Sequence, residues 1–161
     1  MNVQDNLFEK PLIDYITVAV EYCKTLESCQ GQDRKDFVEV MRKLLPMMYL
    51  KFSLLPEYEE YPGFNEPHVT EEDYDFIRYN IAKTMGEQDD FLDVFVEDFK
   101  YSDQPVLCTL GENLSDIYRC QRDFIEIVRG GHDEALRVSL YELQEQFRCS
   151  WGMKCLNSLR A

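Results

Sequence analysis

Two carboxylates four residues apart are the best candidate for chemistry in this sequence. Glu112 and Asp116 stand in the run G-E-N-L-S-D-I-Y, which ends at Tyr118. Residues four apart share one face of a helix, and two like charges there oppose helix formation unless something compensates them. One interpretation is a carboxylate network inside a helical bundle, balanced by Arg119 or by an arginine of a neighbouring helix. The other is a cation or small-ligand site between helices, with Tyr118 and Trp151 as its further residues.

The single tryptophan marks a second unusual run, S-W-G, at residues 150–152. A glycine inside a helix costs about 1 kcal/mol relative to alanine. Gly152 therefore predicts the close approach of another helix. We expect Trp151 to pack beside that contact and its indole N–H to have a hydrogen-bond partner.

The remaining reactive residue types match no familiar site pattern. His68 and His132 stand at expected helix boundaries, where exposed histidines are common. None of the six cysteines forms a C-x-x-C pair, and their spacing fits no zinc site; Cys23, Cys120 and Cys149 fall in helical patterns typical of buried thiols. The chain has no E-x-x-H, P-loop, G-x-G-x-x-G, H-E-x-x-H or EF-hand motif. The sequence therefore leaves the catalytic residues unknown and predicts no metal and no cofactor.

The acidic residues are concentrated in the central third of the chain. The formal net charge is −14, and residues 57–103 hold 15 acidic and three basic residues, a net −12. Nucleic acids and anionic membranes bind proteins through Lys and Arg, so direct binding of either is not expected. Three interpretations remain open: a solvated face, a docking surface for a basic protein, or a mimic of DNA.

Apolar residues recurring every three or four positions predict helices almost throughout. The expected helices are at about 5–28, 34–55, 70–86, 88–98, 105–129 and 132–159. No strand of four or more alternating residues is apparent. We therefore expect an all-α protein, a single domain over residues 1–161 built as a bundle of about six mostly antiparallel helices.

Prolines, caps and glycines set the expected helix boundaries. Pro11 favours a first turn, so the first helix is expected to start near residue 9 or 10. Asp33 is the expected cap of the second helix, and Pro46 predicts a kink inside it. Thr70 opens T-E-E-D, which resembles a capping box, and Gly86 is a natural stop for the helix that follows.

The segment 56–69 breaks the helical pattern with three prolines and three aromatic residues. A connection of this length is long for a compact domain and is typical of functional or compact surface loops. Tyr58, Tyr61 and Phe64 are therefore candidates for a partner surface, or for a patch that joins two copies of the chain.

Several short runs resemble one family. L-S-D-I-Y, followed about 30 residues later by W-G and by the C-terminal L-x-x-L-R-A, is similar to a bacterial family of small all-helical proteins, domain of unknown function five-zero-six-three. E-Y-C-K-T-L-E at 21–27 and L-L-P at 54–56 resemble it too. That family usually has more acids before D-I-Y and a histidine before W-G, where this chain has Glu112-Asn113 and Ser150. The resemblance implies a helical fold and a bacterial origin, and it implies no activity.

Our main hypothesis is a cytoplasmic, non-catalytic protein-interaction module that uses the acidic central face. The start of the chain resembles no signal peptide, and no apolar run is long enough for a membrane span. The partner is unknown, with a basic protein as the simplest complement, and monomer and homodimer both stay open. The alternative is an enzyme that binds a small molecule or a metal around Glu112 and Asp116.

Overall fold

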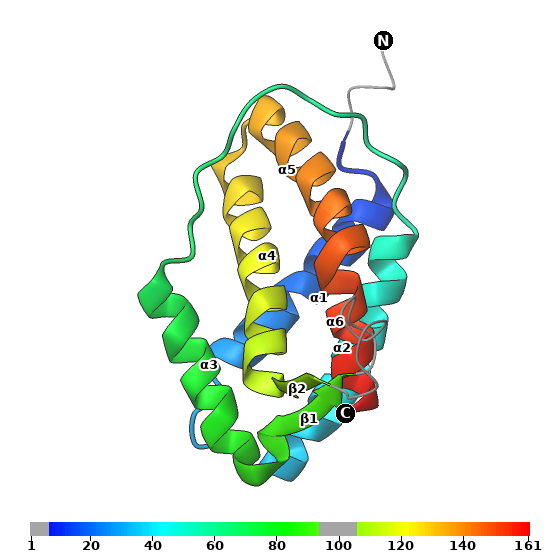
Figure 1. The fold of residues 1–161 in the computed structure, drawn as a ribbon. Helices are drawn as coiled ribbons and strands as arrows, with labels where there is room; N and C mark the ends of the chain where they lie inside the picture. Colours follow the sequence, from blue (N-terminus) through cyan, green and yellow to red (C-terminus); the bar gives the residue numbers. More distant parts are fainter. Residues whose placement is uncertain (1–6, 94–105) are drawn as a thin grey trace.

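The structure is a computed structural model that describes residues 7–93 and 106–161. Its helices are α1 (Lys10–Glu27), α2 (Arg34–Ser53), α3 (Glu71–Met85), α4 (Leu110–Gly130), α5 (Asp133–Gln146) and α6 (Gly152–Arg160). Helix α4 packs against α1, α3, α5 and α6 (Figure 1). The predicted all-α bundle of about six helices is confirmed.

The helix starts follow the predicted signals. Helix α1 begins after Glu9 with Pro11 in its first turn, and α2 begins after Asp33 with Pro46 inside it. The cap of α3 is a complete capping box: the Thr70 hydroxyl accepts from the Asp73 N–H, and the Asp73 carboxylate accepts from the Thr70 N–H. Of these three boundaries, only the Thr70 cap pairs side chains with main-chain N–H groups that a helix start leaves free, because Glu9 and Asp33 make no side-chain cap bond.

The prediction for residues 88–109 was wrong in the part that the structure describes. A 3₁₀ turn at Gly86–Asp89 leads into strand β1 (Asp90–Asp93), which pairs antiparallel with β2 (Val106–Thr109). Helix α4 accordingly starts at Leu110, where the Thr109 hydroxyl accepts from the Glu112 N–H. The strands are too short for periodicity to separate them from helix, because four residues span about one helical turn. Residues 94–98 of the expected helix lie outside the described residues.

The expected last helix is interrupted by a π-helical turn. The turn covers Phe147–Trp151 and separates α5 from α6. The closest atom to a Cβ built at Gly152 belongs to the same segment, the carbonyl oxygen of Phe147 at 2.6 Å. Helix α6 also packs against α2 and α4. Glycine is needed here because the wide turn brings that carbonyl against the helix backbone.

Aromatic rings fill the centre of the bundle. Trp151 is fully buried and its ring lies 4.7 Å from those of Phe52 and Phe147, measured between centroids. Its indole N–H donates to the Leu143 carbonyl at 3.1 Å, as predicted. Tyr22 is also fully buried and donates to the Leu114 carbonyl at 2.6 Å. These bonds let the core bury large amphipathic rings without leaving their polar atoms unpaired.

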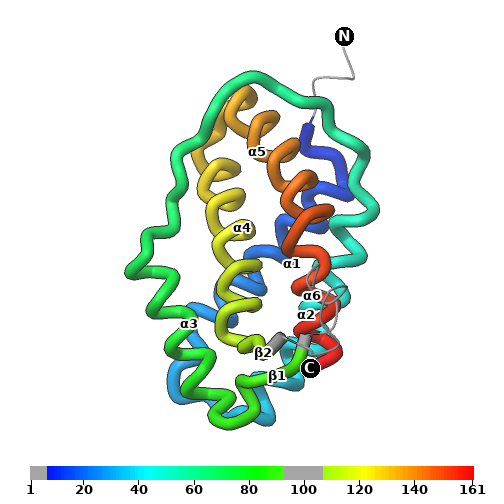
Figure 2. The backbone as a smooth tube through the Cα atoms, in the orientation of Figure 1, coloured from blue at the N-terminus to red at the C-terminus, as the bar shows by residue number. Residues whose placement is uncertain are grey.

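The long connection between α2 and α3, residues 56–69, runs over the end of the bundle where α4 meets α5 (Figures 1 and 2). We call it the strap. Gln144 of α5 holds its start: the side-chain carbonyl accepts from the Tyr58 N–H at 2.8 Å, and the side-chain N–H donates to the Pro56 carbonyl at 2.7 Å. Asn65 donates to the Ala135 carbonyl at 2.9 Å. The strap is therefore fastened to the helices beneath it along its length.

Candidate functional site

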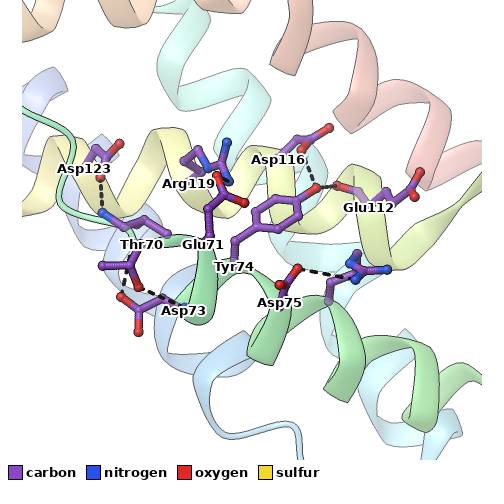
Figure 3. A network of polar contacts seen from close by, with 11 residues as sticks. Thr70, Glu71, Asp73, Tyr74, Asp75, Glu112, Asp116, Arg119 and Asp123 are labelled. Atoms are coloured by element: carbon purple, nitrogen blue, oxygen red, sulfur yellow. Dashed lines mark hydrogen bonds and ion pairs between the residues drawn. The ribbon is translucent and has the colours of Figure 1, made fainter.

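The side of α4 that faces α3 carries polar residues at helical spacing (Figure 3). Its members are Glu112, Asp116, Arg119 and Asp123. Both carboxylate oxygens of Asp116 are engaged: Oδ1 accepts from the Tyr74 hydroxyl at 2.6 Å, and Oδ2 lies 2.5 Å from Nζ of Lys154. Asp116 thus joins α4 to α3 and α6 at once. We call this set of contacts the clasp.

Tyr74 is the centre of the clasp. Burial, and then its hydrogen bond to Asp116, raise the pKa of the Tyr74 hydroxyl, because ionisation would place a second negative charge beside the carboxylate. The guanidinium carbon of Arg119 lies 4.3 Å from the centre of the Tyr74 ring, a cation–π distance. Arg119 also forms an ion pair with Glu71 at 3.3 Å.

Asp123 extends the clasp to the end of the strap. Its Oδ1 accepts hydrogen bonds from the His68 N–H at 2.9 Å and the Val69 N–H at 2.8 Å. These two amides come just before the Thr70 capping box, so Asp123 fixes the point where the strap becomes α3 (Figure 3). Hydrogen bonds to an ionised acceptor are among the stronger ones in proteins.

The cation that balances Asp116 is Lys154, whereas Arg119 pairs with Glu71. Neither Tyr74 nor Lys154 had a signal in the sequence, because they lie 42 and 38 residues from Asp116. Asp123 did have one, since it continues the spacing of Glu112 and Asp116 along the same helix. Glu112 itself is exposed, and its carboxylate does not share the partners of Asp116.

The four residues predicted to form one ligand site do not converge. Tyr118 donates to Glu27 at 2.9 Å, away from Asp116, and Trp151 is enclosed in the aromatic core. A cation at Asp116 would also have to displace Lys154. The proposed ligand site at Glu112 and Asp116 therefore remains a prediction. Among the described residues, these four side chains do not line a common cavity.

Tyr118 instead faces a small cavity of about 320 Å³ between α1, α3 and α4. Its polar lining residues include Glu27, His68, Asp73 and Arg122. Arg122 lies between two acids, 3.6 Å from Glu27 and 2.8 Å from Glu126. Burial and Glu27 raise the pKa of Tyr118, so its hydroxyl stays a proton donor. No group of three or more His, Cys, Asp or Glu within residues 7–93 and 106–161 is arranged to hold a metal ion.

The strap aromatics separate into two places. Tyr58 and Tyr61 line a groove of about 600 Å³ between the start of the strap and the start of α1. Phe64 is exposed and borders a different cavity of about 470 Å³, between the strap, α4 and α5. The three aromatics therefore form no single patch.

The groove beside α1, which we call the strap groove, is strongly acidic. Four glutamates line it: Glu9, Glu57, Glu59 and Glu60. Glu57 has an ion-pair partner, Arg148, at 3.3 Å, and Arg137 also lines the groove. Burial, and then the charge of Glu9, raise the pKa of Tyr58 to about 12. The groove thus presents two tyrosine rings beside more glutamates than arginines.

The cysteines follow the predicted pattern in part. All six are free thiols, and burial raises the pKa of Cys120 and Cys155 to about 12 and that of Cys23 still further. A high pKa suppresses the reactive thiolate. The expectation that Cys149 is buried was wrong: it lies exposed in the π-helical turn.

The described helices include none that is both long and apolar enough to cross a membrane.

The molecule is a small helical bundle fastened by a polar clasp and a long strap. Residues 6–161 match the family described as Domain of unknown function (DUF5063), and the chain belongs to that family. No curated protein matches it.

A solved structure has the same fold. The chain is similar to protein BF1032 from Bacteroides fragilis, known from a crystal structure, with 36% sequence identity and a TM-score of 0.85. The match covers 96% of this chain and 90% of that one. The overall helical fold is therefore one that has been observed by experiment.

Proposed function

We propose that the protein is a protein-interaction module whose strap groove binds a lysine- or arginine-rich segment of a partner. The observation that carries this proposal is the groove itself, about 600 Å³ in volume, in which Tyr58 and Tyr61 lie among four glutamates. It gives the acidic part of the chain a concave surface, and a concave surface can hold a side chain in one place.

Both kinds of lining residue favour a cationic ligand. A carboxylate pairs with an ammonium or guanidinium group, and the face of a tyrosine ring attracts the same cation. Glu59 and Glu60 are exposed, so they are positioned to receive a charged side chain without prior burial. Because Tyr58 keeps its proton to a pH of about 12, the ring does not add a further charge to the groove.

Charge outside the groove supports the approach of such a partner. Glu66, Glu71 and Glu72 are exposed on the strap and at the start of α3, in a protein of net charge −14. Complementary fields mainly accelerate association, whereas contacts inside the groove set the residence time. We therefore propose two separate roles. The acidic surface attracts a basic partner, and the strap groove selects it.

The test uses a defined probe, a fluorescein-labelled decapeptide of alternating lysine and serine, titrated with the full chain by fluorescence anisotropy. The variant Glu59→Gln/Glu60→Gln removes two charges from the groove. The control Glu72→Gln/Glu87→Gln removes two exposed charges outside it. We expect the groove variant to weaken binding about tenfold and the control less than about twofold.

A second peptide, with arginine in place of lysine, shows which cation the groove prefers. If the groove variant and the control variant weakened peptide binding equally, binding would depend on net charge alone. That result would contradict a groove that selects its partner. The proposal would also be overturned if neither the lysine nor the arginine peptide showed saturable binding at low salt.

A further inference from the structure

A second groove lies where α2 begins and α6 ends. These two helix ends lie at the end of the bundle opposite the strap (Figure 1). Its volume is about 290 Å³, and we call it the end groove. One wall is α2, with Phe37, Met41 and Leu45. The other walls include Met85 and Leu114, and all five side chains are at least 95% buried. The floor of the groove is therefore continuous with the apolar core.

The rim of the end groove is basic, unlike most of the protein. Arg34, Val38 and Arg42 stand four residues apart on α2, so they lie along one side of the helix and border the opening. Both arginines are exposed, and Arg42 lies 3.3 Å from Glu39. Glu39 does not itself line the groove. The opening thus combines an apolar interior with two guanidinium groups at its edge, where Gln88 and Ala161 also line it.

A buried hydroxyl without a partner among the described residues lies in the wall of the end groove. Ser158 of α6 lines the end groove, is 7% exposed, and its Oγ has no hydrogen-bond partner in the described part of the chain. A buried hydroxyl without a partner is costly in a folded protein. Because the Oγ is itself sealed from solvent, a ligand oxygen would reach it only once the Ser158 side chain turned toward the groove.

We propose that the end groove binds a fatty carboxylate of medium chain length. The aliphatic chain lies between α2 and α4, where the thioethers of Met41 and Met85 adapt to an irregular guest. The carboxylate lies at the rim, where a planar guanidinium pairs with its two oxygens. A volume near 290 Å³ is just below the usual range for small-molecule sites, which favours a medium-length aliphatic chain over a larger ligand. This site is separate from the strap groove and does not depend on it.

Isothermal titration calorimetry of the full chain with sodium decanoate, kept below its micellar concentration, tests the proposal. Arg34→Gln/Arg42→Gln removes the rim cations. Lys35→Gln/Lys43→Gln is the matched control, because it removes the same charge from α2 at residues that do not line the groove. We expect one decanoate per chain, affinity at least about tenfold lower in the arginine variant, and a change of less than about twofold in the lysine variant.

Two further measurements locate the ligand and test its chemistry. Methyl NMR is expected to show decanoate shifting Met41 and Met85, while Met48, buried elsewhere in the core, and the exposed Met153 stay in place. The uncharged 1-decanol is expected to bind wild type and the arginine variant alike. Val38→Trp, at the exposed rim, is expected to block both ligands without disturbing the core.

Three outcomes would overturn the proposal. The first is the absence of saturable decanoate binding. The second is equal weakening by the arginine and lysine variants, which would indicate attraction to net charge. The third is tighter binding of a leucine-terminated peptide than of decanoate, which would assign the end groove to a protein C-terminus.

Discussion

The clasp on α4 and the strap groove beside α1 are both rich in charged residues, but their charges have different partners. In the clasp, Asp116 contacts Tyr74 and Lys154, and Asp123 accepts from two main-chain amides. In the strap groove, Glu59 and Glu60 are exposed beside tyrosine rings. Partnered charges hold helices together, whereas exposed charges in a groove stay open to a ligand.

The comparison shows that spacing alone does not tell a partnered carboxylate from an open one. Glu112 and Asp116 attract attention because two acids on one helical face need compensation, and the fold supplies it for Asp116 from α3 and α6. The strap glutamates have no helical spacing to single them out. We propose a role for them because they line the groove that the strap forms with α1.

The largest effect is expected from Asp123→Ala, which removes the acceptor for the His68 and Val69 amides. Hydrogen bonds to charged groups contribute about 1.5–3 kcal/mol, so we expect a loss of about 2 kcal/mol in the free energy of unfolding. Urea denaturation measures it. The control Asp75→Ala removes an exposed acid paired only with Arg78 and is expected to cost less than about 0.5 kcal/mol. Equal losses would show that Asp123 does not anchor the strap.

The next largest effect on stability is expected from Asp116→Asn. This variant also tests the alternative that Asp116 belongs to a metal or small-molecule site. We expect a loss of about 1–2 kcal/mol, because Lys154 loses its counter-charge while part-buried. Native mass spectrometry of wild type and variant is expected to give the same mass apart from the substitution. The exposed Glu112→Gln is the control for stability. An extra mass on the wild type that the variant loses would instead support a ligand or metal at Asp116.

Tyr74→Phe is expected to cost about 1 kcal/mol at pH 8, through loss of the bond to Asp116. Burial and Asp116 raise the pKa of Tyr74, so above pH 10 the unfolded chain loses a proton that the folded protein keeps. The wild type therefore loses stability as the pH rises above 10, and phenylalanine does not share this part of the loss. The gap between the two proteins should narrow between pH 8 and 10.5 in urea denaturation.

The control for this pH dependence is Tyr79→Phe, an exposed tyrosine on the same helix. Its stability is expected to stay close to wild type at pH 8. A gap for Tyr74→Phe that widens with rising pH would contradict the assigned direction of the pKa.

Local signals were sufficient for most of the fold. The Thr70 capping box, the Pro11 start of α1 and the glycine stop after α3 depend on neighbours within a few residues, and each was predictable. The β1–β2 pair was not, because its register depends on hydrogen bonds between separate segments. The π-helical turn before Gly152 likewise has no periodic signal.

The candidate sites depended on long-range contacts, so the sequence described them less well. It identified Tyr58 and Tyr61 from the composition of the strap but could not separate them from Phe64, which borders another cavity. The sequence gave no reason to place Arg34 and Arg42 near Ser158, because these residues belong to helices that lie far apart in the sequence. Spacing reports which residues share a helix face, and packing decides which faces meet.

The smallest effect on stability is expected where we propose function. Glu59→Gln/Glu60→Gln should change the free energy of unfolding by less than about 0.5 kcal/mol, because surface substitutions without buried partners seldom do more. Two fewer negative charges in an acidic protein would make any change slightly stabilising. Urea denaturation of this variant beside Asp123→Ala measures the contrast directly. If Glu59→Gln/Glu60→Gln lowered the free energy of unfolding as much as Asp123→Ala, the two glutamates would hold the strap in place. They would then not be free to bind a partner.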